Sequence, residues 1–246
     1  MLILVISALF IIAFTVAYFY YDYKNQSVDP RVKQANIMYE RYNDLTENAE
    51  YQKIFLLMDS LENIYCRYPH YRNSYEVGVL YNNRAASYLA MALAQNDSTH
   101  KDSLLRLAEK HTLTSIDIYK DWLDAWEGKS ENEIMEKLKL HFNPEDTVFK
   151  GKDVGRYINH RAKGIREAQF ETVRRMSVSY TNLGIIFRHR KNYEAAAREY
   201  FKALELWPDN QAAENNLNIL MDEPLNKPNI LRRLFPKDRR AFPQHE

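Results

Sequence analysis

The sequence has few of the residues that punctuate β-sheets or small stapled domains. Its 246 residues include one cysteine, six glycines and eight prolines. A single cysteine cannot form an internal disulfide or supply a cysteine-based zinc site, which excludes a disulfide-rich secreted scaffold and a zinc ribbon. Four of the prolines follow residue 223, so little interrupts the rest of the chain. Because strands and hairpins need such turn residues at short intervals, the composition predicts an all-α fold.

The chain also lacks an excess of charge of either sign. It carries 34 Lys+Arg against 33 Asp+Glu, and 46% of its residues are hydrophobic. This composition excludes a fully disordered protein and a polybasic nucleic-acid binder, so no nucleic-acid partner is expected. The average conceals a segregation of charge. Residues 1–21 contain no charged side chain, whereas residues 224–246 contain six basic and two acidic ones, a net charge of +4.

Residues 1–21 form an uninterrupted apolar run. As a helix it would be about 31 Å long, close to the thickness of the hydrocarbon core of a bilayer. Tyrosines and a phenylalanine cluster at its end, and Asp22 and Lys24 follow, as at a membrane–water interface. We predict a single-pass transmembrane anchor over residues 1–21 and a juxtamembrane linker over residues 22–30. The alternative is a cleaved signal peptide with its cleavage site at Thr15-Val16-Ala17, against which the absent basic n-region and the length of the run both count.

The sequence does not settle which side of the membrane the rest of the chain faces. Basic residues follow the apolar run at Lys24, Arg31, Lys33 and Arg41. They favour a cytoplasmic body under the positive-inside rule. The bias amounts to a few charges, so the side stays open.

The clearest motif lies in the last third of the chain. It reads Tyr180-x2-Leu183-Gly184-x2-Phe187, followed by Ala196-x3-Tyr200-x2-Ala203-x4-Pro208. This pattern resembles the tetratricopeptide repeat family in all eight of its signature positions. The two small residues allow antiparallel helices to cross closely, the large ones fill the seam, and the proline ends the second helix. The resemblance implies an α-α superhelix, a short solenoid, with this repeat and a capping helix over residues 176–221.

Weaker copies of the repeat are predicted over residues 31–128. Tyr81-x2-Arg84-Ala85-x2-Tyr88 repeats the spacing of the first helix, and Ala108-x3-Thr112-x2-Ser115 that of the second. A polar turn over residues 95–102 separates them. A third, more degenerate unit is predicted over residues 31–69, with apolar residues at three- and four-residue spacing.

Two further regions depart from the repeat pattern. Residues 129–175 are predicted to form an irregular helical insertion, in which Ser130 and Glu133 form a capping box that opens a short helix. A polar loop follows, and a long helix begins near Val154 and continues into the last repeat. Residues 222–246 are predicted to be a basic, proline-containing tail.

No motif supports catalysis. The seven histidines lack metal-ligand spacing, and the sequence has no nucleophile elbow, phosphate-binding glycine loop or dinucleotide fingerprint. We therefore expect no catalytic residues, no metal and no cofactor. Two alternatives stay open: a ligand-binding or enzyme-accessory subunit with a site in residues 120–175, and a structural component that self-associates as a homo-oligomer.

Binding is the function that the repeat implies. A superhelix of helix pairs presents its first helices on a concave face, which suits an extended peptide or a partner helix. We predict a scaffold or adaptor that binds a protein or peptide partner in a membrane-associated complex. The predicted groove residues are Asn82, Asn83, Leu89, Thr181, Ile185, Arg188 and His189. Asn83 resembles the asparagine with which some family members hold the terminal carboxylate of a chaperone tail, but the Lys/Arg pair of that clamp is missing.

Overall fold

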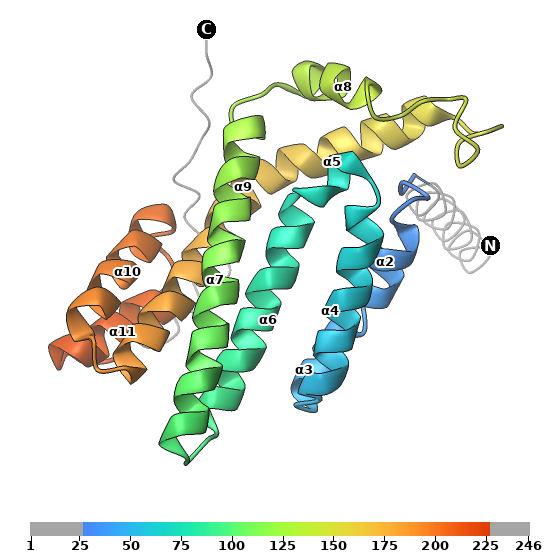
Figure 1. Ribbon diagram of the computed structural model, residues 1–246. Helices are drawn as coiled ribbons and strands as arrows, with labels where there is room; N and C mark the ends of the chain where they lie inside the picture. The colour runs from blue at the N-terminus through green and yellow to red at the C-terminus, as the bar shows by residue number, and fades with distance from the viewer. Residues whose placement is uncertain (1–26, 227–246) are drawn as a thin grey trace, which may run out of the picture.

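Helices are the only regular elements in residues 27–226, the range that the computed structural model describes (Figure 1). The all-α prediction is confirmed for this range. The predicted anchor over residues 1–21 and most of the predicted tail, residues 227–246, lie outside it. Among the described residues, no helix combines the length and the apolar character needed to cross a membrane. The helices are α2 (Lys33–Tyr39), α3 (Tyr42–Glu47), α4 (Tyr51–Cys66), α5 (Pro69–Arg72), α6 (Tyr75–Leu93), α7 (Ser98–Trp126), α8 (Glu131–Lys139), α9 (Val154–His189), α10 (Tyr193–Leu206) and α11 (Gln211–Met221).

Side-chain caps fix where many of these helices begin. The predicted capping box is present at α8, where Ser130 and Glu133 bond each other's backbone N–H groups. Asp97 caps α7 by accepting a hydrogen bond from the backbone N–H of His100 at 2.6 Å. Because of this cap, α7 begins at Ser98, and the predicted polar turn over residues 95–102 is shorter than expected.

The helices form successive antiparallel pairs. The split helix α2–α3 pairs with α4, α6 pairs with α7, and the last part of α9 pairs with α10. Neighbouring pairs contact each other through α4 with α6, and through α6 and α7 with α9. Helix α11 packs on α10 at one edge of the stack, and α2–α4 lie at the opposite edge (Figure 1).

The second pair has a close contact at a residue that the repeat spacing does not pick out. The repeat spacing places the small crossing residue at Ala85, which is buried. A close approach lies one heptad earlier, at Gly78, which lies against the ring of Tyr119 and whose carbonyl accepts a hydrogen bond from Ser115 Oγ at 3.0 Å. Spacing alone could not select between these two positions, because both are small residues on the same face of α6.

Helix α9 connects the irregular region to the last pair. It begins at Val154 and runs for 36 residues, about 54 Å, as the sequence predicts. Its first part packs with α8 and the end of α7 around Trp126, Phe142 and Phe149. The loop before α9 is therefore not wholly polar, since Phe149 is 1% exposed within it.

Residues 27–31, here called the lead-in segment, belong to the folded body. Ser27 and Asp29 are buried, although the sequence analysis placed both in a linker over residues 22–30. Ser27 Oγ accepts a hydrogen bond from Arg156 Nε at 2.7 Å, and Asp29 Oδ2 accepts one from the Tyr71 hydroxyl at 3.0 Å. These contacts hold the segment against α5 and α9.

Candidate partner-binding site

The predicted groove residues lie on α6 and α9, which pack against each other. Asn82 of α6 is half-buried, and its Oδ1 accepts hydrogen bonds from Ser179 Oγ at 2.9 Å and from Asn182 Nδ2 at 3.3 Å. Both donors belong to α9. The side-chain oxygen of Asn82 therefore joins α6 to α9, the first helices of the second and last pairs.

Three of the seven groove residues, Asn83, Leu89 and Thr181, are buried. Asn83 Nδ2 donates to the Tyr39 hydroxyl at 2.9 Å, which ties α6 to α2. Thr181 Oγ1 accepts a hydrogen bond from Nδ2 of Asn210 at 3.0 Å, and Leu89 lies in a hydrophobic cluster with residues of α7 and α9. The repeat pattern predicted that all three would be exposed. They hold neighbouring helices together, because adjacent pairs pack through the faces that a repeat pattern assigns to the groove.

The remaining three, Ile185, Arg188 and His189, are half-buried near the end of α9. Burial lowers the pKa of His189, and the positive charges of Lys101 and Arg188 lower it further. The imidazole is therefore neutral at pH 7 and stands beside two cations. This end of α9 carries positive charge near the turn before α10.

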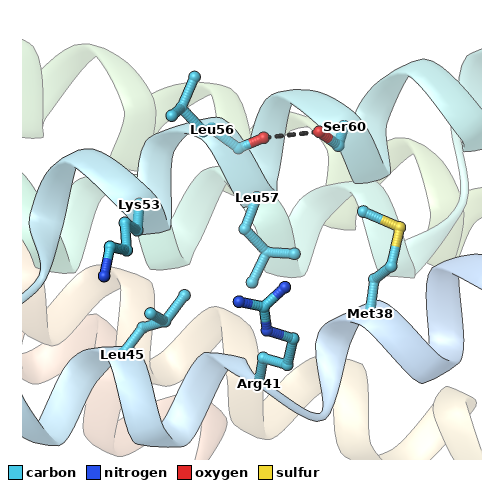
Figure 2. A pocket seen from close by; sticks show the side chains of 7 residues that line it. All are labelled: Met38, Arg41, Leu45, Lys53, Leu56, Leu57 and Ser60. Atoms are coloured by element: carbon cyan, nitrogen blue, oxygen red, sulfur yellow. Dashed lines mark hydrogen bonds between the residues drawn. The ribbon is translucent and has the colours of Figure 1, made fainter.

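A pocket that the sequence analysis did not identify lies between α2, α3 and α4 (Figure 2). Its volume is about 240 Å³, and none of its lining residues belongs to α6 or to any later helix. Leu45 and Leu57 are buried, whereas Leu56 is 67% exposed. Ser60 Oγ donates to the Leu56 carbonyl at 2.8 Å, so the hydroxyl of this lining residue is satisfied within α4. The lining residues are Met38, Arg41, Leu45, Lys53, Leu56, Leu57 and Ser60.

The pocket is apolar with basic side chains around it. Arg41 and Lys53 are both exposed, and Lys53 forms an ion pair with Glu50. Such a site suits an apolar side chain of a partner segment, with a polar or anionic group near Arg41. A signal for it existed in the sequence: residues 54–58 are all apolar, and five consecutive residues cover more of the circumference of a helix than one buried stripe does.

A second cluster, at the other end of α4, is buried and charged. The guanidinium of Arg161 forms a bidentate ion pair with Glu76, its Nε donates to His70 Nε2 at 3.1 Å, and it lies 4.5 Å from the ring centroid of Tyr71. Burial alone would raise the pKa of Glu76, but the charge and hydrogen bonds of Arg161 bring it below its ordinary value. Burial, with Arg161 next, lowers the pKa of His70 to about 2.

Arg31 extends this cluster to the irregular region. It forms an ion pair with Asp29 and donates to the backbone carbonyl of His141 at 2.8 Å. Its guanidinium also lies 4.4 Å from the ring centroid of Phe142. The charged groups of this cluster have their partners within the protein, so its evident role is to join the lead-in segment, α5, α6 and α9. Sequence reasoning missed it, because Glu76 and Arg161 are 85 residues apart.

The residues described here contain no group of three or more His, Cys, Asp or Glu side chains placed to hold a metal ion. Comparison of the chain with protein-family models, curated proteins and solved structures gives no significant match. The resemblance to tetratricopeptide repeats therefore rests on the signature residues of the last helix pair.

Proposed function

We propose that this protein is a membrane-anchored helical-repeat scaffold that binds a protein or peptide partner and carries no catalytic activity. The anchor is residues 1–21, whose length and lack of charge suit a bilayer-spanning helix. The binding body is the stack of helix pairs, whose last pair carries the tetratricopeptide repeat signature. Stacked helix pairs of this kind present extended surfaces for partner segments.

The observation that carries the proposal is the apolar pocket between α2, α3 and α4. Leu56 stands 67% exposed at its edge while Leu57 and Leu45 are buried within it. An exposed leucine beside an open apolar pocket is unfavourable in water, and a partner that fills the pocket with an apolar side chain covers both. The pocket therefore replaces the buried groove residues Asn83, Leu89 and Thr181 as the leading binding surface.

Site-specific photo-crosslinking tests the proposal in native membranes. A photoreactive amino acid replaces Leu56 in the full-length chain, and the matched control carries it in place of Leu107, which is 39% exposed on α7 and does not line the pocket. We expect one discrete crosslinked protein from position 56 and none from position 107. The variant Leu45→Glu, which places a charge in the pocket, should abolish that crosslink. Identical products from positions 56 and 107, or none from either, would count against a partner in the pocket.

A further inference from the structure

The most exposed large hydrophobic side chain in residues 27–226 is Leu140, at 83%. It is the C-cap residue of α8, and its neighbours Lys139 and His141 are also exposed. Phe142, two residues later, turns inward and is 2% exposed. Transfer of such an exposed apolar side chain from water into an apolar phase is favourable.

This turn is fixed beside the lead-in segment. Arg31 donates to the His141 carbonyl at 2.8 Å, and its guanidinium lies 4.4 Å from the Phe142 ring centroid and 4.8 Å from that of Phe149. Arg156, in the first turn of α9, bonds Ser27. The end of α8 that carries Leu140 is therefore held beside the lead-in segment.

The length of the intervening chain limits how far this end can be from the anchor. Five residues, 22–26, separate Tyr21, the last of the uncharged run, from Ser27, so the chain takes six Cα–Cα steps between them. A fully extended chain covers at most about 3.6 Å per residue, so this stretch reaches no more than about 22 Å. The headgroup layer of one leaflet takes up about 5–8 Å of that distance. An anchor over residues 1–21 thus keeps the lead-in segment, and Leu140 with it, close to the bilayer surface.

Lysine side chains flank Leu140 in the sequence. Residues 136–153 contain four lysines, at 137, 139, 150 and 152, interspersed with four acidic residues, Glu136, Glu145, Asp146 and Asp153. All four lysines are exposed. Lys137, Lys139 and Lys152 each make a local contact, with the Ala125 carbonyl, the Glu136 carboxylate and the Val148 carbonyl. Lysines beside an exposed apolar side chain are typical of surfaces that lie in the headgroup layer of a membrane.

We propose that Leu140 and these four lysines form a docking surface for a bilayer that contains anionic phospholipid. Leu140 inserts at the boundary between headgroups and acyl chains, and the lysines contact the phosphate groups around it. This second contact fixes the orientation of the helix stack relative to the membrane, which a single anchor helix leaves free to rotate. The inference rests on the proposed anchor over residues 1–21.

A fluorescent label at position 140 tests this surface. The full-length chain carries Cys66→Ser, which removes its only native cysteine, and Leu140→Cys labelled with an environment-sensitive nitrobenzoxadiazole group. The control carries the label through Leu93→Cys, which is 44% exposed at the end of α6. In nanodiscs of mixed zwitterionic and anionic phospholipid, we expect blue-shifted emission that is quenched by brominated lipid at position 140 and not at position 93. Lys150→Glu, or nanodiscs without anionic lipid, should weaken the quenching.

Other outcomes separate this inference from the proposed anchor. A third label, through Ala13→Cys, reports on residues 1–21 directly. Quenching at position 13 with an aqueous spectrum at position 140 would overturn the docking surface and leave the anchor standing. An aqueous spectrum at both positions would overturn both. Shielding of position 140 in native membranes but not in lipid nanodiscs would also overturn it, because the occupant would then be a protein.

Discussion

Gly184 of α9 lies directly against the ring of Tyr200 on α10, so that a Cβ at Gly184 would come within 2.4 Å of Tyr200 Cε1. Gly78 of α6 has the same relationship to Tyr119 of α7, again at 2.4 Å. Both tyrosines have 0% exposure, so neither ring can move outward to relieve a contact. In both helix pairs, a missing side chain on the first helix makes room for an aromatic ring on the second.

We expect Gly78→Ala and Gly184→Ala each to lower the stability of the protein. Overpacking a core costs about 1–3 kcal/mol, and the gain in helix propensity from glycine to alanine is about 1 kcal/mol. Because the new methyl group would meet a confined ring, the cost of overpacking should exceed the gain in helix propensity. The net loss of stability should be up to about 2 kcal/mol for each variant. Urea unfolding of the full-length chain in detergent, followed by circular dichroism, measures the difference.

Gly164→Ala is the matched control for these variants. Gly164 lies within α9, and a Cβ there would meet nothing within 4 Å. The substitution should therefore stabilise the protein by about 1 kcal/mol through helix propensity alone. The close packing of the two helix pairs would be refuted if all three alanine variants had the same effect.

The buried ion pair between Arg161 and Glu76 should respond differently to single and double substitution. Glu76→Gln or Arg161→Met leaves one buried charge without its partner, which costs about 3–5 kcal/mol. The double variant Glu76→Gln with Arg161→Met removes both charges, so its loss should be much smaller than the sum of the two single losses. The same urea titration applied to all four proteins gives the coupling energy. Additive losses would show that the two side chains do not interact.

His70 should make the protein less stable in mild acid. Its pKa is lowered to about 2 in the folded state, whereas an unperturbed histidine has a pKa near 6.5. Below pH 6.5 the unfolded chain therefore binds a proton that the folded protein does not. Its contribution to stability is fully present above pH 6.5 and falls by about 1.4 kcal/mol per pH unit as the pH drops toward 2.

His70→Gln should reduce this pH dependence, because the amide oxygen can still accept the hydrogen bond from Arg161 without titrating. The free energy of unfolding is measured between pH 6.5 and pH 5.5, where glutamates of the unfolded chain are still largely ionised, for wild type and variant. The control is His100→Gln, at an exposed position. An unchanged slope in His70→Gln would mean that His70 is protonated as readily in the folded protein as in the unfolded chain.

Asn210 should contribute more to the stability of the protein than Asn192, the other asparagine that caps a helix. Both accept a hydrogen bond from the backbone N–H three residues later. Asn210 is also buried and donates to Ser177 Oγ at 2.8 Å and to Thr181 Oγ1 at 3.0 Å. Asn192→Ala should cost about 1 kcal/mol, the usual effect of losing a cap. Asn210→Ala removes two more buried hydrogen bonds and should cost about 2–4 kcal/mol. Equal losses of stability in the two variants would contradict the structural role assigned to Thr181, which accepts one of these hydrogen bonds.

Local patterns in the sequence predicted the helices well. The capping box at Ser130 and Glu133 and the start of the long helix at Val154 follow from residues within one or two turns of each other. The apolar pattern of residues 31–69 predicted two helices, and the structure divides the first of them into α2 and α3. The turn before α7 was placed less accurately, because the cap at Asp97 was not recognised.

The candidate site was predicted less well. Asn83, Leu89 and Thr181 occupy positions that the repeat assigns to an open groove, but each packs against or bonds another helix. The pocket between α2, α3 and α4 depends on how α2 and α3 pack on α4. The spacing of residues along a single helix does not predict that packing. Leu56 was visible in the sequence only as one member of the uninterrupted apolar run over residues 54–58.

What the sequence by itself determined about this protein is its helical class, the caps that start many of its helices, and the segregation of an uncharged first segment from a charged body. These follow from interactions between residues close together in the chain. Only the tertiary structure decided that Gly78 rather than Ala85 receives the ring of its partner helix, that Arg161 pairs with Glu76, and that the lead-in segment is held beside Leu140. Such contacts join residues tens of positions apart, and their energies depend on burial and on helix packing, which exist only once the whole chain has folded.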